Sequence, residues 1–334
     1  MEVEEQRAGA VQRYAALQPA LREVTDDFVG LVTALLDDAG INYVSVTGRT
    51  KSVASFAAKA ARTTVEGEPV YPDPVTDITD QVGVRVVTYL HGDVAAVAGV
   101  LSDQLSVLDD RDMGRETARQ GRFGYSSRHL LVAVDPVRGV PTAYDSLRGH
   151  SASVQVRTIL QHAWAEFEHD VRYKGTIPEE YASDLDRRFT LAAGLLELAD
   201  REFSEIRDRL QVTMGGQQPV ADADDPRISA SDLAAFLAGQ FQEAGWSRTD
   251  HYAWISGLLL ELGITSLDEL GGLLTSVDSS AINARLEYKY PPGAVRRLDD
   301  ALLAAFGERY VGLSGNADRT DALTARLAKL VGPV

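Results

Sequence analysis

Apolar residues recur every three or four positions through residues 3–39, the spacing expected of one face of an amphipathic helix. This pattern predicts two helices. The Gln18-Pro19 pair marks the break between them, because proline lacks the N–H that a helix interior requires. Gly40 ends the second helix, as glycine often does.

Between residues 40 and 175, short β-branched runs alternate with helical patterns. Strands are predicted at 43–47, 84–90, around residue 107, within 123–134 and at 154–157, and helices through residue 61, at 94–105 and at 158–173. The polar stretch 109–122 predicts a loop, and 185–210 predicts a long helix or a helix pair. The alternation indicates an α/β (α+β) domain with a mixed β-sheet flanked by helices.

The composition changes after residue 212. Residues 213–228 carry Gly, Gln, Pro and Asp without periodicity, which is typical of a linker. Only helical patterns follow, at 231–243, 250–262, 266–274, 279–288, 292–306 and 320–331. We therefore expect a first domain at 1–212, a linker at 213–228 and a smaller all-helical domain at 229–334. The helical domain is open to roles in oligomerisation, autoinhibition or partner recruitment.

Charge and cysteine content narrow the function classes. The chain has a formal net charge of −16 and a sequence pI of about 4.8, so nucleic-acid contact would need a local basic patch. It has no cysteine, which excludes disulfides, thiolate nucleophiles and Cys-based zinc sites. The N-terminus lacks the apolar core of a signal peptide, and we expect a cytoplasmic protein.

A basic segment follows the first predicted strand. Residues 46–59 read VTGRTKSVASFAAK, with Arg49, Lys51 and Lys59 beside the hydroxyls of Ser52 and Ser55. Cations and helix N-terminal amides at a strand-to-helix turn can hold a polyphosphate. Neither GxxxxGK[ST] nor GxGxxG occurs in this segment. The competing interpretation is a solvated basic turn.

Three further clusters carry candidate chemistry. Asp80, with Gly83 and Arg85 after it, is a suitable Mg²⁺ ligand at the mouth of a strand, although capping a helix is the commoner role of a lone Asp. In the second cluster, Tyr125 follows a glycine and can stack on a base. The third begins with Q-x-R-T at 155–158 and runs into the helical string 164–174.

Taken together and in this order, the four clusters resemble the synthetase domain of the RelA/SpoT family, the (p)ppGpp synthetases. The resemblance covers about residues 10–210. Its patterns are R-x-K-x-x-x-S-x-x-x-K at 49–59, D-x-x-G-x-R at 80–85, G-Y-x-S-x-H at 124–129, Q-x-R-T at 155–158, W-A-E-x-E-H at 164–169 and Y-K at 173–174. The family's hydrolase half needs a His…His-Asp metal site, and no histidine precedes His91, so we expect a synthetase only.

The resemblance implies a nucleotidyltransferase-like sheet and transfer of the β,γ-pyrophosphoryl group of ATP to the ribose 3′-hydroxyl of GDP or GTP. Arg49 and Arg85 would sandwich adenine, Asp80 would ligate Mg²⁺, and Tyr125 would stack on the acceptor base. The full set comprises catalytic Asp80, Gln155, Arg157 and Glu166; ATP-binding Arg49, Lys51, Ser55, Lys59 and Arg85; and acceptor-binding Arg122, Tyr125, Ser127, His129 and His162.

Two positions depart from the family pattern. The glutamate of E-x-Q-x-R-T is replaced by Ser153, and Asp145 and Glu166 are the candidate substitutes. The basic residue usually found four positions before the tyrosine is replaced by a glycine, and Arg119 or Arg122 would take its role.

Three hypotheses remain open on these residues. The first is a small alarmone synthetase, which we expect to be a homo-oligomer and to use ATP, GDP or GTP, and Mg²⁺. The second is a toxic relative that pyrophosphorylates the tRNA 3′ end or an adenine nucleotide. The third is a catalytically degenerate nucleotide-binding regulator.

Overall fold

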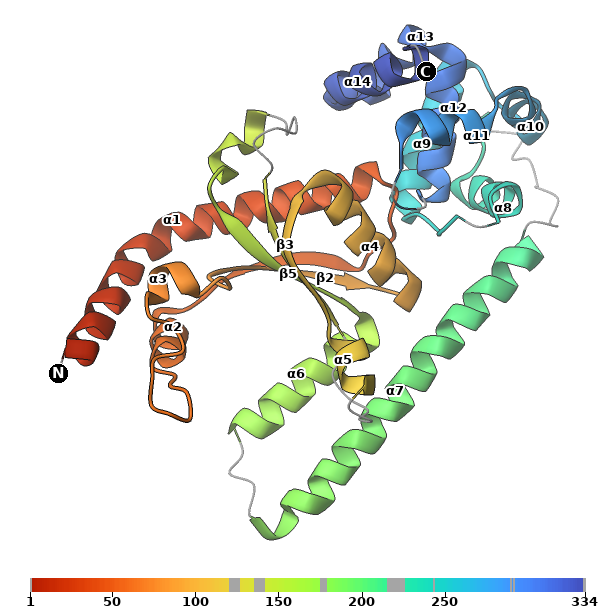
Figure 1. Cartoon of the computed structure of the whole chain (residues 1–334). Helices are drawn as coiled ribbons and strands as arrows, with labels where there is room; N and C mark the ends of the chain where they lie inside the picture. The colour runs from red at the N-terminus through yellow and green to blue at the C-terminus, as the bar shows by residue number, and fades with distance from the viewer. Residues whose placement is uncertain are drawn as a thin grey trace. The chain divides into compact units, whose positions relative to one another are not determined.

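The computed structural model describes residues 2–119, 127–134, 142–174, 179–214, 226–242, 244–288, 290 and 292–332. These residues form two compact units (Figure 1). Unit 1 comprises Met1–Leu35 and Tyr43–Asp200, and unit 2 comprises Leu36–Asn42 and Arg201–Val334. The division at 1–212, 213–228 and 229–334 stays a prediction, because most of the expected linker lies outside the described residues.

A single helix, α1 (Glu2–Asp38), occupies the N-terminal region, so the predicted break at Gln18-Pro19 is wrong. Pro19 lies inside the helix and removes only one backbone hydrogen bond. Tyr14 and Phe28, on either side of it, are both fully buried. Packing on both sides of the proline therefore maintains the helix, in line with the general dominance of tertiary packing over local propensity.

Unit 1 is built on a five-stranded mixed sheet of order β1-β2-β5-β4-β3. The strands are β1 (Ser45–Thr50), β2 (Val82–Thr88), β3 (Ser106–Asp112), β4 (Arg128–Ala133) and β5 (Ser151–Thr158). Only the β2–β5 pair is parallel among the described strand pairs. The prediction of a mixed sheet flanked by helices, followed by a helical C-terminal region, is confirmed.

The polar stretch predicted as a loop contains regular structure instead. Strand β3 continues to Asp112, and helix α5 (Met113–Arg119) follows it. Residues 109–111 are exposed, because β3 is an edge strand of the sheet. An edge strand with polar side chains on both faces shows no apolar alternation, which explains why the strand predicted around residue 107 was not extended to Asp112.

The two faces of the sheet differ in chemistry. Valines at alternate positions of β2 and β5, including Val84, Val86, Val154 and Val156, are buried on the face that α4 (His91–Gln104) covers. Most of the intervening positions carry polar side chains on the opposite face, although Val87 is buried. The burial alternation thus leaves one face of the sheet open for ligand chemistry.

Gly48 explains how α1 approaches this sheet so closely. A Cβ atom at this position would lie 2.6 Å from Thr25 Cγ2 and 2.8 Å from Val29 Cγ2, both on α1. Gly48 lies within β1 and pairs with Val84, whose side chain belongs to the buried face. Its role is therefore to admit the helix.

Further helices complete the described part of unit 1. They are α2 (Val53–Ala60), α3 (Pro74–Asp77), the 3₁₀ helix η1 (Thr142–Leu147), α6 (Ile159–Lys174) and the first part of α7 (Glu179–Met214). Trp164 of α6 packs edge-on against Phe189 of α7, with ring centroids 5.5 Å apart. This contact joins the helix that follows β5 to the long helix after it.

Unit 2 is helical throughout its described residues. Its helices after α7 are α8 (Ala230–Gln240), α9 (Thr249–Leu262), α10 (Leu267–Ser276), α11 (Ser279–Leu286), α12 (Ala294–Phe306), α13 (Glu308–Val311), the 3₁₀ helix η2 (Ser314–Arg319) and α14 (Thr320–Val331). The six predicted helical regions correspond to α8–α12 and α14. The two short helices between α12 and α14 were not predicted.

A buried ion-pair network stabilises this unit. Asp299 of α12 accepts hydrogen bonds from Arg319 at 2.7 Å, from Arg326 at 2.9 Å and from the hydroxyl of Tyr310 at 2.6 Å. The last residue of α1, Asp38, pairs with Arg296 at 2.6 Å.

No helix among the described residues is both long and apolar enough to cross a membrane.

Candidate active site

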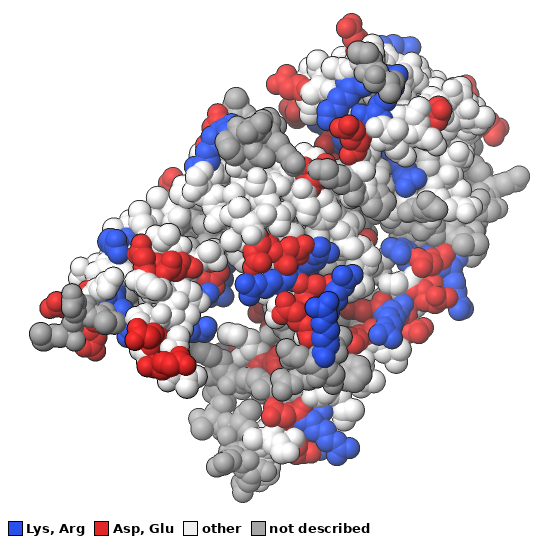
Figure 2. Space-filling view, in the orientation of Figure 1, with Lys and Arg blue, Asp and Glu red and all other residues white. Residues whose placement is uncertain are grey.

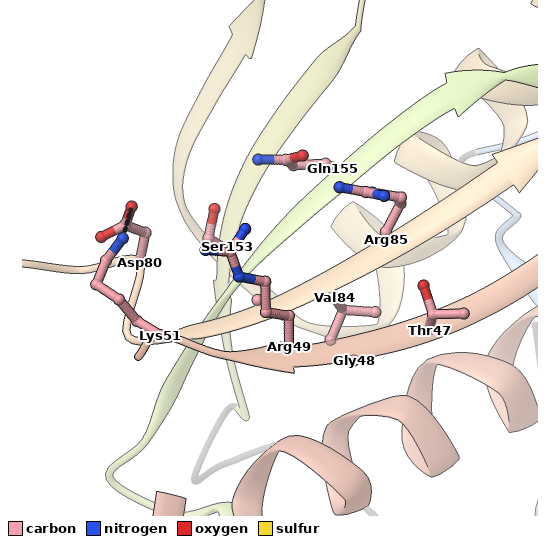
Figure 3. A pocket seen from close by; sticks show the side chains of 10 residues that line it. Thr47, Gly48, Arg49, Lys51, Asp80, Val84, Arg85, Ser153 and Gln155 are labelled. Atoms are coloured by element: carbon pink, nitrogen blue, oxygen red, sulfur yellow. Dashed lines mark ion pairs between the residues drawn. The ribbon is translucent and has the colours of Figure 1, made fainter. Parts of the chain in front are cut away.

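The open face of the sheet carries a row of side chains that crosses all five strands. In register from β1 to β3, the row is Thr47, Arg85, Gln155, His129 and Arg111. Figure 3 shows Arg49, Arg85 and Gln155 projecting on one side of the strands. Residues far apart in the sequence thus meet on one surface because strand pairing aligns them.

A pocket of about 230 Å³ lies at the β1–β2 end of this face. It is lined by Thr47, Gly48, Arg49, Lys51, Asp80, Gly83, Val84, Arg85, Ser153 and Gln155. Three of these side chains are cationic and one is anionic, so the pocket has an excess of positive charge. Such a lining favours a polyanionic ligand.

Two lysines converge on one carboxylate beside this pocket. Lys51 Nζ lies 3.0 Å from Asp80 Oδ2, and Lys59 Nζ lies 3.0 Å from Asp80 Oδ1. Burial alone raises the pKa of Asp80, but hydrogen bonds and charge from the two lysines outweigh it and lower the pKa overall. Asp80 is therefore ionised at neutral pH, as a metal ligand must be.

The predicted strand-to-helix turn lies slightly later than expected. Arg49 belongs to β1, and the turn consists of Lys51 and Ser52. Ser52 caps α2 by accepting a hydrogen bond from the backbone N–H of Ser55 at 3.1 Å, and its hydroxyl donates to Ser55 Oγ at 2.9 Å. Tyr14 of α1 donates to the carbonyl of Lys51 at 2.7 Å. The backbone that carries Lys51 is thereby held from both sides.

Helix α6 brings a carboxylate and an imidazole to Arg85. Arg85 Nη1 donates to Glu166 Oε1 at 2.7 Å, and His162 Nδ1 lies 3.8 Å from the same oxygen. Burial, together with the charge of Arg85, lowers the pKa of His162 and outweighs the opposite effect of Glu166. Glu166 is thus the carboxylate that the structure brings to the strand bearing Arg85.

The β4 side of the face, where the sequence predicts acceptor binding, contains fewer described residues. His129 Nε2 lies 2.8 Å from Ser127 Oγ, and Arg157, which is 2% exposed, donates to Gln155 Oε1 at 2.6 Å. Burial lowers the pKa of His129, as do the charges of Arg157 and Arg111. The predicted Tyr125 and Arg122 lie outside the described residues.

The structure distinguishes the candidate substitutes for the missing glutamate. Ser153 lines the pocket, and its strand pairs with β2 at Gly83. Neither candidate lines the pocket, but Glu166 contacts Arg85, which does, whereas Asp145 pairs with Arg148 at 2.9 Å. Glu166 is therefore the better placed of the two.

One cation on this face was missed by the sequence analysis. Arg111 of β3 lies opposite His129 and pairs with Asp109 at 2.8 Å. Its position inside a segment predicted as a loop concealed it. A strand prediction for residues 106–112 would have aligned Arg111 with the open face.

Among the described residues, no group of three or more His, Asp or Glu side chains could hold a metal ion. The candidate ligand at this site is the single carboxylate of Asp80. Asp80 nevertheless fits Mg²⁺, which is commonly bound through one or two carboxylates together with substrate phosphates and waters. The residues present are thus suited to a metal that arrives with a nucleotide.

Comparison with known proteins defines the class. A family model described as "Region found in RelA / SpoT proteins" matches residues 48–177, the part that carries the pocket. The GTP pyrophosphokinase YjbM of Bacillus subtilis (strain 168) is 33% identical over 170 residues, which is 50% of this chain and 72% of that protein. The chain belongs to the RelA/SpoT family.

Solved structures of small alarmone synthetases are also similar to the chain. Small alarmone synthetase 1 from Bacillus subtilis bound to its product pppGpp is 28% identical, with a TM-score of 0.44, and the match covers 60% of this chain and 97% of that one. The same protein bound to AMPCPP is 28% identical, with a TM-score of 0.41 and coverage of 60% and 98%. The curated relative is a GTP pyrophosphokinase, which supports pyrophosphotransfer as the activity.

Proposed function

We propose that this protein transfers the β,γ-pyrophosphoryl group of ATP to the ribose 3′-hydroxyl of GDP or GTP, making (p)ppGpp. The observation that carries the proposal is the convergence of Lys51 and Lys59 on Asp80 beside a cation-lined pocket, in a chain of the RelA/SpoT family. The acceptor oxygen attacks the β-phosphorus, the bond from the β-phosphorus to the α,β-bridging oxygen breaks, and AMP leaves. The proton of the 3′-hydroxyl passes to a base.

The donor end of the pocket suits ATP. Lys51 and Lys59 would exchange Asp80 for the triphosphate, while Arg49 and Arg85, on adjacent strands, would enclose the adenine ring. Asp80 would then hold Mg²⁺, which neutralises charge on the transferring phosphoryl groups. Ser55, in the first turn of α2, would add a hydroxyl contact to the phosphates.

The middle and far strands suit the acceptor. Gln155 and His129 are neighbours across the β4–β5 pair, and Arg157 and Arg111 add positive charge around His129. The lowered pKa of His129 keeps its imidazole neutral at physiological pH, so it can orient a ribose or phosphate group by hydrogen bonding. We also propose that Tyr125 stacks on the acceptor base, and this part of the proposal rests on the family resemblance alone.

Glu166 is our candidate for the base. A carboxylate accepts the hydroxyl proton only when it is close to the reacting oxygen. Glu166 accepts a hydrogen bond from Arg85, and adenine binding between Arg49 and Arg85 would loosen that contact. Ser153 cannot replace a carboxylate in this role, because a serine hydroxyl remains neutral at physiological pH.

Ser153 also favours a second candidate function. A chain that retains the ATP pocket and lacks an effective base would bind nucleotides without turnover and act as a regulator. Transfer to tRNA receives less support, since Lys and Arg are interspersed with Asp and Glu over the described residues of the face shown in Figure 2. A broad basic surface is what non-specific RNA binding requires.

Incubation of the purified chain with γ-labelled ATP and Mg²⁺, offered GDP, GTP, ATP or tRNA in turn, tests these functions. Labelled guanosine tetra- or pentaphosphate supports the proposal. Transfer to tRNA or ATP would instead support the toxic relative that pyrophosphorylates the tRNA 3′ end or an adenine nucleotide. Nucleotide binding without transfer would support the regulator. Asp80→Asn should abolish transfer, and Glu166→Gln should reduce it about 100-fold or more while ATP still binds.

A further inference from the structure

The junction between β5 and α6 is fixed by a reciprocal pair of hydrogen bonds. The backbone N–H of Thr158 donates to Gln161 Oε1 at 2.9 Å, and the backbone N–H of Gln161 donates to Thr158 Oγ1 at 3.2 Å. This arrangement is a capping box, in which the N-cap and N3 residues satisfy each other's backbone donors. Thr158 is therefore the N-cap of α6.

A third element, helix α7, takes part in this cap. The Thr158 hydroxyl donates a hydrogen bond of 2.8 Å to Asp200 Oδ2 of α7, and both residues are buried. A hydroxyl has one proton to donate and lone pairs with which to accept. Because the Thr158 O–H donates to Asp200, the lone pairs of the same hydroxyl oxygen are left to accept from the amide of Gln161.

Asp200 is a costly residue to keep for stability alone. Burial raises its pKa, an effect that the Thr158 hydrogen bond and the nearby His91 only partly offset. A carboxyl group whose pKa is higher in the folded than in the unfolded state lowers stability once the pH exceeds the unfolded pKa. The position therefore retains an acid that works against folding at neutral pH.

The first turns of α6 carry the side chains that approach Arg85, a residue that lines the pocket. His162 and Glu166 lie one turn apart on α6, and Glu166 accepts a hydrogen bond from Arg85. A shift of the N-cap would move both side chains relative to the strands. Displacements of about 1 Å suffice to lower the rates of enzymes that depend on positioned groups.

We propose that Asp200 is a positioning residue for the pyrophosphotransfer reaction. Acting through the hydroxyl of Thr158, it sets the start of α6 and so holds His162 and Glu166 against Arg85. This inference rests on the proposed function for its catalytic consequence. Its structural part, the placement of the first turn of α6, stands independently of any activity.

The full-length chain carrying Thr158→Val or Asp200→Leu tests the inference, with Thr158→Ser and Asp200→Asn as conservative counterparts that keep the hydroxyl or an acceptor oxygen. Asp184→Asn removes an exposed acid from the same helix and is the matched control. NMR titration of His162 reports its burial and its proximity to Arg85, which together lower its pKa. Amide hydrogen exchange at Gln161 reports the cap.

In Thr158→Val and Asp200→Leu, we expect the pKa of His162 to rise towards its ordinary value as its burial decreases and it moves away from Arg85. Exchange at Gln161 should accelerate about fivefold, the usual effect of a lost N-cap. If the enzyme is active, kcat should fall about tenfold while KM for ATP changes little, because Lys51 and Lys59 are untouched. The conservative variants and the control should stay near wild type.

An unchanged His162 pKa and unchanged Gln161 exchange in both disruptive variants would overturn the inference. A fall in Tm without either change would likewise assign Asp200 a purely structural role. If the wild-type chain transfers no pyrophosphoryl group, the proposed function fails, and the titration and exchange measurements still decide the placement of α6.

Discussion

The arginines and lysines of the open sheet face and those of the helical unit are used in opposite ways. In the pocket, three cationic side chains face one carboxylate, and Arg49 is exposed to solvent. In unit 2, a matched set of three acids and three bases forms a closed network, comprising Asp38, Asp299, Asp300, Arg296, Arg319 and Arg326. Excess charge on an open surface is available to a ligand, whereas balanced buried charge is committed to the fold.

The largest expected effect comes from unbalancing the buried network. Asp299→Ala leaves Arg319 and Arg326 without their shared carboxylate, and we expect a loss of about 3–5 kcal/mol in the free energy of unfolding of unit 2. Urea unfolding followed by tryptophan fluorescence measures it, because Trp254 stacks on Arg319 at 4.6 Å. Asp318→Ala, an exposed acid nearby, should change stability by less than about 0.5 kcal/mol. Equal effects of the two variants would contradict the comparison.

Removal of a pocket cation should produce the opposite pattern. Lys51→Met keeps the Lys59–Asp80 pair, so stability should change by less than about 1 kcal/mol. ATP affinity should fall about 10-fold to 100-fold, because a charge-assisted phosphate contact is lost. Isothermal titration calorimetry with a non-hydrolysable ATP analogue and Mg²⁺ measures the change. Unimpaired binding would show that the lysine belongs to the fold and not to the site.

Lowering the pH should weaken the buried ion-pair network by protonating the carboxylate of Asp38. Burial raises the pKa of this carboxyl group, but the charges of Arg296, Arg326 and Arg319 outweigh it and lower the pKa to about 2. Because the folded value lies below the unfolded one, the stabilisation is present above about pH 4 and is lost as the pH falls towards 2. The side chain is 39% exposed, so solvent screening limits the contribution to about 1 kcal/mol.

Comparison with Asp38→Asn over pH 2–6 isolates this contribution. The difference in urea midpoint between wild type and variant should be largest near pH 5 and should shrink as the pH approaches 2. Parallel curves across the whole range would mean that the ionisation of Asp38 does not contribute to stability.

The smallest effect is expected at the far edge of the sheet. Arg111→Ala should raise KM for GDP or GTP about threefold, with KM for ATP unchanged, since this exposed arginine already has Asp109 as a partner. Steady-state kinetics with each nucleotide varied in turn measures both constants. A larger change in KM for ATP than for the acceptor would place Arg111 at the wrong end of the site.

The sequence allowed most of this fold to be predicted where burial imposes a pattern. Val84 and Val154 lie in strands with a strong apolar signal, and both strands were predicted. The break at Pro19 was wrong because packing of α1 against β1 outweighs one lost hydrogen bond. The strand predicted around residue 107 is present as β3, but its extension to Asp112 was missed because the polar side chains there give no periodic signal.

The site was partly predictable for a related reason. Lys51, Lys59 and Asp80 stand at spacings that identify them, and the structure brings them together. Asp200 gave no signal, because its partner Thr158 lies 42 positions away in the sequence. Contacts of that kind depend on how a helix packs, which local sequence does not specify.

The cross-strand row from Thr47 to Arg111 also has a consequence for divergence within such enzymes. Neighbouring strands lie about 4.8 Å apart, so the two edge strands are separated by about 19 Å. No single side chain spans that interval. If the donor nucleotide binds at the β1 edge as proposed, substitutions at the β3 edge can accumulate without disturbing it, so that the choice of acceptor can drift while the donor stays fixed.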